Sequence, residues 1–425
     1  MEQALHHTKI ITYKGVLTKM KKIKKKPLLF VFVLVATVVL TACDSGPQER
    51  GLLADTIGLA TERAEALTES LTAFTGVQGL TIAIVDAETG FTWTQGFGYA
   101  DTTNNIPVTE DTVFMIASVS KLFTAIAAMQ LVEQGLIDLD EPIVTYLPNF
   151  SILPHFTDGG DYRNITTRML LNYTSGLPME PPGVHWPDLF THDGHDDEFL
   201  NSLLMLLHNT NMIAQEGTRT SYSNAGMELL GILMASMAGY DNYFEGFVNL
   251  TNGSLFEPLG LTLTSYVLND EIIENMSLAY INHLSQHSFI GYYNALPSGS
   301  MVSNANEMAI LMHAILRDIM FDDGQLLQQE TFNQMLDISD APRSRYAMGH
   351  LRVHWGLGIK ERVSASGISH FGHGGMGEGH HAEMIFHPET GIGVFVSVNS
   401  DVGRIVSTML SEELLVSAVN EKMGN

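Results

Sequence analysis

Apolar side chains return every three or four positions in some stretches of the chain and alternate or run continuously in others, so both helices and strands are expected. The helical spacing predicts helices over 54–74, 113–136, 304–316 and 405–423. Alternating or continuous apolar residues predict strands over 80–101 (two strands joined by a turn at Glu88-Thr89-Gly90), 351–359, 367–373, 380–388 and 392–399. A fold of the α+β class follows.

The order of these elements predicts how the chain is divided. Strands lie at both ends of the domain, 56–425, while its middle has helical and loop character. One α/β lobe is therefore expected to form from 56–134 together with 296–425, with a helical lobe, 135–295, inserted between them. Because clefts form at lobe junctions, a binding site is expected there.

The first 42 residues differ from the rest. A lysine-rich stretch starts at Met20, which we expect to be the start in place of Met1, and an apolar run ends in Leu40-Thr41-Ala42-Cys43. This arrangement is typical of a secretory signal, and its end resembles a bacterial lipobox, in which the cysteine is lipidated. We expect a signal peptide, a lipidated tether over 43–55 and attachment to a membrane of the bacterial cell envelope at Cys43; an uncleaved signal anchor is the alternative.

Without the signal the protein is strongly acidic. Residues 1–42 hold eight of the 22 basic residues and one of the 47 acidic residues, which leaves 14 basic and 46 acidic residues and a net charge of −32. Such a surface repels nucleic acid and anionic lipid headgroups, so no nucleic-acid partner is expected. The remaining lysines are Lys121, Lys360 and Lys422.

One of these lysines follows a serine by one helical turn. In ASVSKLFTAI, Ser118 precedes Lys121 by three residues where a helical pattern begins. A serine there commonly caps the helix. The alternative is a nucleophile, because a buried lysine with a lowered pKa on the same helix face can remove the proton of a serine hydroxyl.

Two further motifs follow along the chain. Tyr222-Ser223-Asn224 precedes a helix, and His373-Gly374-Gly375 ends a predicted strand. With Ser118-x-x-Lys121, they resemble the motifs of the class C β-lactamase-like serine hydrolases, which include class C β-lactamases, serine D-alanyl-D-alanine carboxypeptidases, D-aminopeptidases and related esterases. The resemblance spans roughly residues 60–425 and implies a β-lactamase/transpeptidase-like fold, with an antiparallel sheet flanked by the N- and C-terminal helices and an inserted all-helical lobe.

The resemblance also implies catalytic roles. Ser118 would be acylated, while Lys121 and Tyr222 share proton transfer and nearby positive charge keeps the Tyr222 phenol acidic. Asn224 would bind the acyl-side amide of the substrate and help to fix Lys121. The backbone N–H groups of Ser118 and Met376 would form the oxyanion hole.

The third motif departs from the Lys-Thr-Gly of many relatives. His373 is expected to be mostly neutral near pH 7, which weakens attraction for the carboxylate of a β-lactam. Gly374 and Gly375 would leave room for a substrate along the strand edge. This pattern is compatible with carboxypeptidases, aminopeptidases and esterases of the family.

The sequence therefore predicts an exported serine hydrolase for small-molecule or peptide amides or esters, with no cofactor and no metal. A β-lactamase proper and a non-catalytic penicillin-binding sensor are the alternatives. His380 and His381 are consecutive strand residues that point to opposite faces, so they are not a natural metal chelate. HDGHDDE, 192–198, is expected to be a solvated loop and helix start. These patterns do not predict the oligomeric state.

Overall fold

A computed structural model describes residues 58–181, 183–184, 189–191, 194–195, 197–281, 285–287, 292–339 and 353–424. The chain divides into two compact units, 1–55 and 56–425. The predicted signal and Cys43 lie outside the described residues. Within the described ranges, no helix combines the length and the apolar character needed to span a bilayer.

An antiparallel sheet of eight strands lies at the centre of the second unit, in the part of the chain that the structure describes. Its spatial order is β10-β11-β12-β13-β14-β1-β2-β3. The bounds are β1 Gly79–Asp86, β2 Phe91–Asp101, β3 Ile106–Pro107, β10 Val353–Trp355, β11 Lys360–Val363, β12 Ser369–Met376, β13 His381–His387 and β14 Ile392–Val398. Because β1 pairs with β14, the two ends of the domain form one sheet, and the predicted α+β fold is confirmed.

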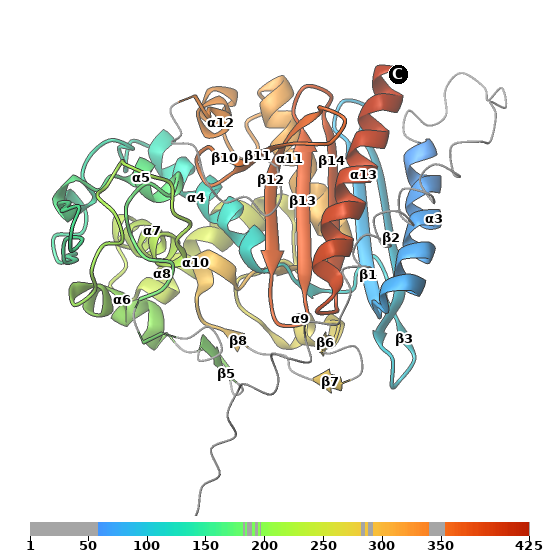
Figure 1. Cartoon of the computed structure of the whole chain (residues 1–425), viewed down its shortest axis with the longest axis horizontal. Helices are drawn as coiled ribbons and strands as arrows, with labels where there is room; N and C mark the ends of the chain where they lie inside the picture. Colours follow the sequence, from blue (N-terminus) through green and yellow to red (C-terminus); the bar gives the residue numbers. More distant parts are fainter. Residues whose placement is uncertain are drawn as a thin grey trace, which may run out of the picture. The chain divides into compact units, whose positions relative to one another are not determined.

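Helices cover the sheet because its central strands have no polar face. Every residue of β1 and of β14 is buried, which requires packing on both sides. The terminal helices α3 (Gly58–Thr75) and α13 (Gly403–Met423) pack against each other over one face, and α11 (Ala305–Phe321) packs behind it (Figure 1).

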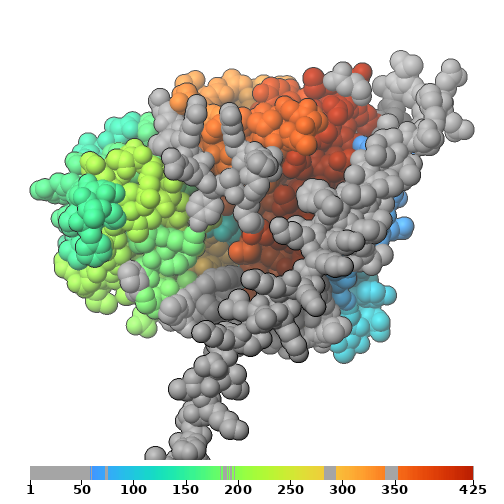
Figure 2. Space-filling model, viewed as in Figure 1, coloured from blue at the N-terminus to red at the C-terminus, as the bar shows by residue number. Residues whose placement is uncertain are grey.

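The region between the two sets of strands is mainly helical, but the lobe expected to be all-helical, 135–295, also contains short strands. Its helices are α4 Ser120–Glu133, α5 Thr167–Leu171, α6 Glu198–His208, α7 Asn224–Met237, α8 Tyr243–Thr251, α9 Asp270–Asn275 and α10 Leu296–Gly299; α12, Gln329–Leu336, follows α11. It also holds the short strands β5 Phe190–Thr191, β6 Ala279–Ile281, β7 Ser285–His287 and β8 Tyr292–Tyr293. In Figure 2 the green surface of this region and the orange and red surface of the C-terminal elements lie on opposite sides of the view.

The predicted helix over 113–136 was too long. The structure has strand β4, Phe114–Met115, paired with β9, Val302–Ser303, then a 3-10 turn, Ala117–Val119, and only then α4. Ala117 has a φ of 48°, which is uncommon for a residue other than glycine and breaks the helical path. The predicted strand over 351–359 was also too long, because β10 ends at Trp355 and residues 356–359 are not in a strand, while 351–352 lie outside the described residues.

Candidate active site

Ser118 lies in the 3-10 turn before α4 and is partly exposed. Its side chain makes no capping hydrogen bond, so the capping interpretation is wrong for this serine. Ser120 holds the turn instead: its hydroxyl donates to the carbonyl of Ala117 at 2.5 Å and accepts from the N–H of Met301 at 3.0 Å. The hydroxyl of Ser118 is thereby left for other contacts.

Strand β12 packs directly against this turn. A Cβ atom added to Gly375 would lie 1.9 Å from the carbonyl oxygen of Ile116 and 3.2 Å from the nitrogen of Ser118. One added to Gly374 would lie 2.5 Å from Oε2 of Glu383. Both glycines are therefore needed for contacts within the protein, and the prediction that they leave room for a substrate is corrected.

Lys121 is fully buried one turn after Ser118. Its Nζ donates to Oγ of Ser118 at 3.1 Å and also to the carbonyl oxygen of Ser298. Burial lowers the pKa of Lys121 to about 7, although the carboxyl groups of Glu228 and Glu180 attract its charge. An amine with this pKa is partly unprotonated at neutral pH, as a general base must be.

Tyr222 is positioned by the start of α7. The hydroxyl of Ser223 caps this helix by accepting from the N–H of Gly226 at 2.8 Å, and donates to the carbonyl of Pro178 at 2.5 Å. The ring of Tyr222 lies 4.9 Å from Nζ of Lys121. Burial raises the pKa of Tyr222, against a hydrogen bond with Ser118 that lowers it. The expected acidic phenol is thus a wrong prediction, because desolvation outweighs the hydrogen bond and the charge of Glu180 also raises the pKa. Lys121 is the stronger candidate for the base.

Asn224 is the first residue of α7, and its amide is already engaged. Its Nδ2 donates to Oε1 of Glu180, whereas the amine of Lys121 is held by Ser118 and Ser298. Asn224 therefore does not fix Lys121 in the way that was expected. Its buried Oδ1 has no hydrogen-bond partner among the described residues and is available to accept from a ligand.

His373 is 2% exposed and neutral. Burial lowers its pKa well below the ordinary value, and the charges of Lys360 and Lys121 add to the effect. Because its Nδ1 lies 2.8 Å from the carbonyl oxygen of Gly374, Nδ1 carries the proton and Nε2 is an acceptor. The side chain of Met376, by contrast, is 56% exposed at the end of β12, so only the backbone of that residue is a candidate for the oxyanion hole.

Sequence reasoning missed several residues around Lys121. Glu180 follows the TSGLP stretch, and Glu228 lies four residues after Asn224 on the same face of α7. That spacing was a usable signal for Glu228. Burial raises the pKa of Glu228 to about 8, against hydrogen bonding by Ser298 and attraction by Lys121. Burial also raises the pKa of Glu180.

Two aromatic residues that the sequence did not single out also surround the site. The ring centroid of Tyr173 lies 4.9 Å from that of Tyr222 and 4.5 Å from that of Trp355. Trp355 in turn lies 5.5 Å from the ring of His373. These rings exclude water from the interior side of the site, which is the cause of the large pKa shifts.

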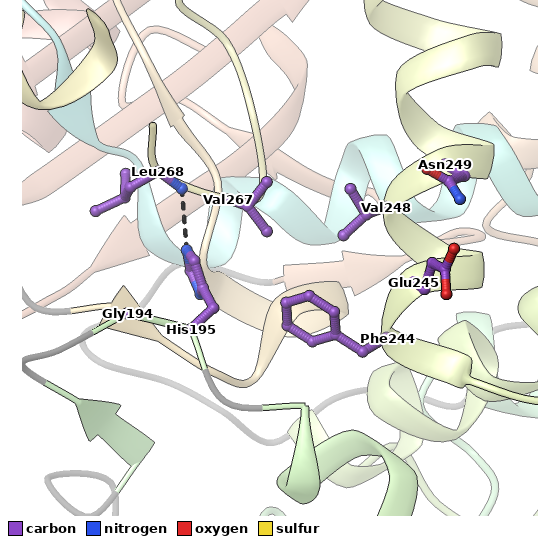
Figure 3. A pocket seen from close by; sticks show the side chains of 8 residues that line it. All are labelled: Gly194, His195, Phe244, Glu245, Val248, Asn249, Val267 and Leu268. Carbon is purple, nitrogen blue, oxygen red and sulfur yellow. Dashed lines mark hydrogen bonds between the residues drawn. The ribbon is translucent and has the colours of Figure 1, made fainter. Parts of the chain in front are cut away.

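A cavity of about 470 Å³ lies outside this cluster, and none of the motif residues lines it (Figure 3). Phe244 and Val248 of α8 and the segment with Val267 and Leu268 form its walls, and Nε2 of His195 accepts from the N–H of Leu268 at 3.0 Å. The candidate active site is therefore defined by the hydrogen bonds around Ser118 and not by this cavity.

The side chains considered for a metal have other partners. His380 stacks edge-on against Phe114, and Nε2 of His381 lies 3.0 Å from the carbonyl oxygen of Asp401. In the ranges that the structure describes, no three His, Cys, Asp or Glu side chains are grouped to hold a metal ion. The 192–198 stretch is described only in part, and α6 begins at its last residue, Glu198.

The comparison with protein families decides the identity. A family model described as Beta-lactamase matches residues 65–411. The chain belongs to the beta-lactamase family. This beta-lactamase-family chain has the fold of a group of serine hydrolases, and the matched region contains all three motifs. The chain spans between 18% and 50% of the length of the curated relatives that it matches.

Solved structures share the fold of this beta-lactamase-family chain. An octameric penicillin-binding protein homologue from Pyrococcus abyssi superimposes with a TM-score of 0.68 at 22% identity, covering 86% of this chain and 78% of that one. EstCE1, a hydrolase with promiscuous acyltransferase activity, superimposes with a TM-score of 0.67 at 19% identity, covering 84% of this chain and 98% of that one. A D-stereospecific amidohydrolase from Streptomyces sp. superimposes with a TM-score of 0.63 at 22% identity, covering 83% of this chain and 98% of that one. At these identities the likeness establishes the fold.

Proposed function

We propose that this protein is an exported, lipid-anchored serine hydrolase that cleaves amides or esters through an acyl-enzyme on Ser118. The observation that carries the proposal is the 3.1 Å contact between Nζ of Lys121 and Oγ of Ser118, made by a fully buried amine with a pKa of about 7. A structural lysine would have a carboxylate partner, whereas this one has a serine hydroxyl and a carbonyl.

The proposed reaction begins when Lys121 accepts the hydroxyl proton of Ser118. The Ser118 oxygen forms a bond to the substrate carbonyl carbon, and the oxyanion accepts hydrogen bonds from the N–H groups of Ser118 and Met376. The proton returns to the leaving amine or alcohol through Lys121 or the neutral phenol of Tyr222 as the scissile bond breaks. Water then hydrolyses the acyl-enzyme with the same groups in reverse.

Two observations bear on the substrate class. His373 at the third motif is neutral, so it offers no fixed cation for a substrate carboxylate. The free acceptor of Asn224 matches the N–H of an acyl-side amide. The family resemblance supports amides and esters as substrates, including cell-wall-type peptides, and the structural neighbours include a D-stereospecific amidohydrolase and a hydrolase with promiscuous acyltransferase activity.

Labelling with a fluorescent fluorophosphonate tests the nucleophile. We expect the full-length protein to be labelled and the Ser118→Ala variant to be unlabelled. Equal labelling of both proteins would contradict the mechanism. A labelled protein with no turnover of a p-nitrophenyl ester, a D-alanyl-D-alanine peptide, a D-amino-acid amide or nitrocefin would favour a non-catalytic sensor.

The lipid anchor is tested separately. Cys43 follows an apolar run and small residues, as a lipidated cysteine does. Cys43→Ser is expected to prevent incorporation of a labelled fatty acid and to release the protein from the membrane fraction. Incorporation that is unchanged in the variant would contradict lipidation at this residue.

A further inference from the structure

The acidic residue of α7, Glu228, lies behind the proposed active site. Its side chain is fully buried, and its Oε1 accepts from the backbone N–H of Ser298 at 3.0 Å. Its Oε2 has no hydrogen-bond partner among the described residues. A buried carboxyl group that is only half satisfied costs free energy, so its presence here calls for a role.

The peptide groups of Ser298 connect Glu228 to Lys121. The N–H of Ser298 donates to Glu228, and the carbonyl of the same residue accepts from Nζ of Lys121. We propose that Glu228 is a positioning residue for Lys121, which it aims at Ser118 through the backbone of Ser298. This inference rests on the proposed function, in which Lys121 is the base for Ser118.

The packing of α10 makes this connection rigid. A Cβ atom added to Gly231 of α7 would lie 2.3 Å from Cγ of Pro297, so α7 and α10 are in close contact. On the other side, Oγ1 of Thr124 in α4 donates to the carbonyl of Pro297 at 2.7 Å. Pro297 and Ser298 are therefore held between the helix that carries the base and the helix that carries Glu228.

The groups that face Lys121 are otherwise neutral, with one exception. Burial raises the pKa values of Tyr222, Tyr266 and Tyr293 and lowers that of His373, so none of these side chains is charged at neutral pH. Glu180, on the loop before α6, is the exception, and it is hydrogen-bonded to Asn224. Glu228 itself is largely protonated at pH 7, because burial raises its pKa to about 8, so it acts on Lys121 through its hydrogen bond with the N–H of Ser298.

The rate of fluorophosphonate labelling at Ser118, measured against pH on the full-length protein, tests the inference. We expect Glu228→Leu, which removes the acceptor for Ser298, to slow labelling by about 10- to 100-fold. Glu228→Gln keeps an acceptor for Ser298, so its maximal rate should stay within about threefold of the wild type. Its acid midpoint should stay near that of the wild type, because protonated Glu228 carries no charge to lose.

Asp318→Asn is the matched control. Asp318 is a fully buried carboxyl group on α11 that also accepts from backbone N–H groups, those of Gln325 at 2.8 Å and Leu326 at 2.7 Å. This variant should lose thermal stability but keep the labelling rate and the midpoint. Wild-type labelling speed in Glu228→Leu, or labelling in Glu228→Gln as slow as in Glu228→Leu, would overturn the inference. If Glu228→Leu does not fold, Glu228→Ala, which also removes the acceptor, is compared with Glu228→Gln in its place. A wild type that is not labelled at Ser118 would instead refute the proposed function.

Discussion

Two lysines, the fully buried Lys121 and the partly buried Lys360, each lie near a buried glutamate. In the first pair, Lys360 of β11 has its Nζ 3.4 Å from Oε1 of Glu383, which also forms an ion pair with Arg362. In the second, Lys121 of α4 contacts the Ser298 carbonyl and the Ser118 hydroxyl, and it is not in direct contact with Glu228.

The pKa values of the two glutamates differ accordingly. Burial tends to raise the pKa of Glu383, but Lys360 and Arg362 outweigh it and leave the pKa below the ordinary value. Burial dominates at Glu228 and raises its pKa to about 8. The pKa of Lys360 is lowered by burial to about 8 and that of Lys121 to about 7. Direct ionic contact therefore keeps one site charged and structural, whereas neutral acceptors leave Lys121 able to take up a proton.

Exchanging each lysine for methionine gives the largest expected contrast. Lys121→Met should reduce the rate of Ser118 acylation by about 10³-fold, because the base is lost. Lys360→Met should lower thermal stability and keep the rate per folded molecule within about threefold. Labelling kinetics and thermal unfolding of both variants check this, and equal loss of rate in the two would remove the distinction between the sites.

Neutralising Glu383 tests the structural pair. Glu383→Gln leaves Lys360 and Arg362 as buried cations without their carboxylate, so the free energy of unfolding should fall by about 3 kcal/mol at pH 7. Since the folded-state pKa of Glu383 is lowered, its contribution is present above the ordinary value of 4.5 and is lost as the pH falls through the folded-state pKa. Urea unfolding at pH 7 and below pH 4.5 measures this, and a difference from wild type that does not shrink in acid would contradict it.

The two glycines of the third motif are neighbours in sequence, but Gly375 lies against the turn that holds Ser118 and Gly374 lies against Glu383. Gly375→Ala places a methyl group against the backbone of Ile116, displaces the Ser118 turn and should reduce acylation by about 10²-fold. Gly374→Ala instead presses on the carboxylate of Glu383 and should cost about 1–3 kcal/mol of stability with a smaller effect on rate. Labelling and unfolding of the pair distinguish the outcomes, and the reverse pattern would show that the assignment of faces is wrong.

The smallest expected effect is the pH dependence of the wild type. Only neutral Lys121 can accept the serine proton, so the value of kcat/KM should rise with pH and level off above about 7. Below that pH it should fall about tenfold per unit, as expected for one titrating base. The profile can be measured with a p-nitrophenyl ester. A midpoint of the rise in kcat/KM near pH 10 would show that burial does not lower the pKa of Lys121.

Local patterns predicted some elements closely. The turn at Glu88-Thr89-Gly90 lies between β1 and β2, and α13 begins at Gly403, two residues before its predicted start. The turn around Ser118 was missed because Ala117 has an uncommon φ that is required by contact with β12 and not by its neighbours in sequence. β11 was missed because three of the four residues in KERV are charged, and the buried one, Arg362, forms an ion pair with Glu383 of β13.

The chain's periodicity and motif spacing were sufficient to indicate the α+β fold, the helix after Ser118 and the three motifs, because each depends on residues that are close in sequence. The charge state of Lys121, the neutral phenol of Tyr222 and the part taken by Glu228 could be read only from the folded protein. They arise from desolvation and from contacts such as the one between Lys121 and Ser298, 177 positions apart. Desolvation depends on which distant segments pack together, and local sequence carries no measure of it.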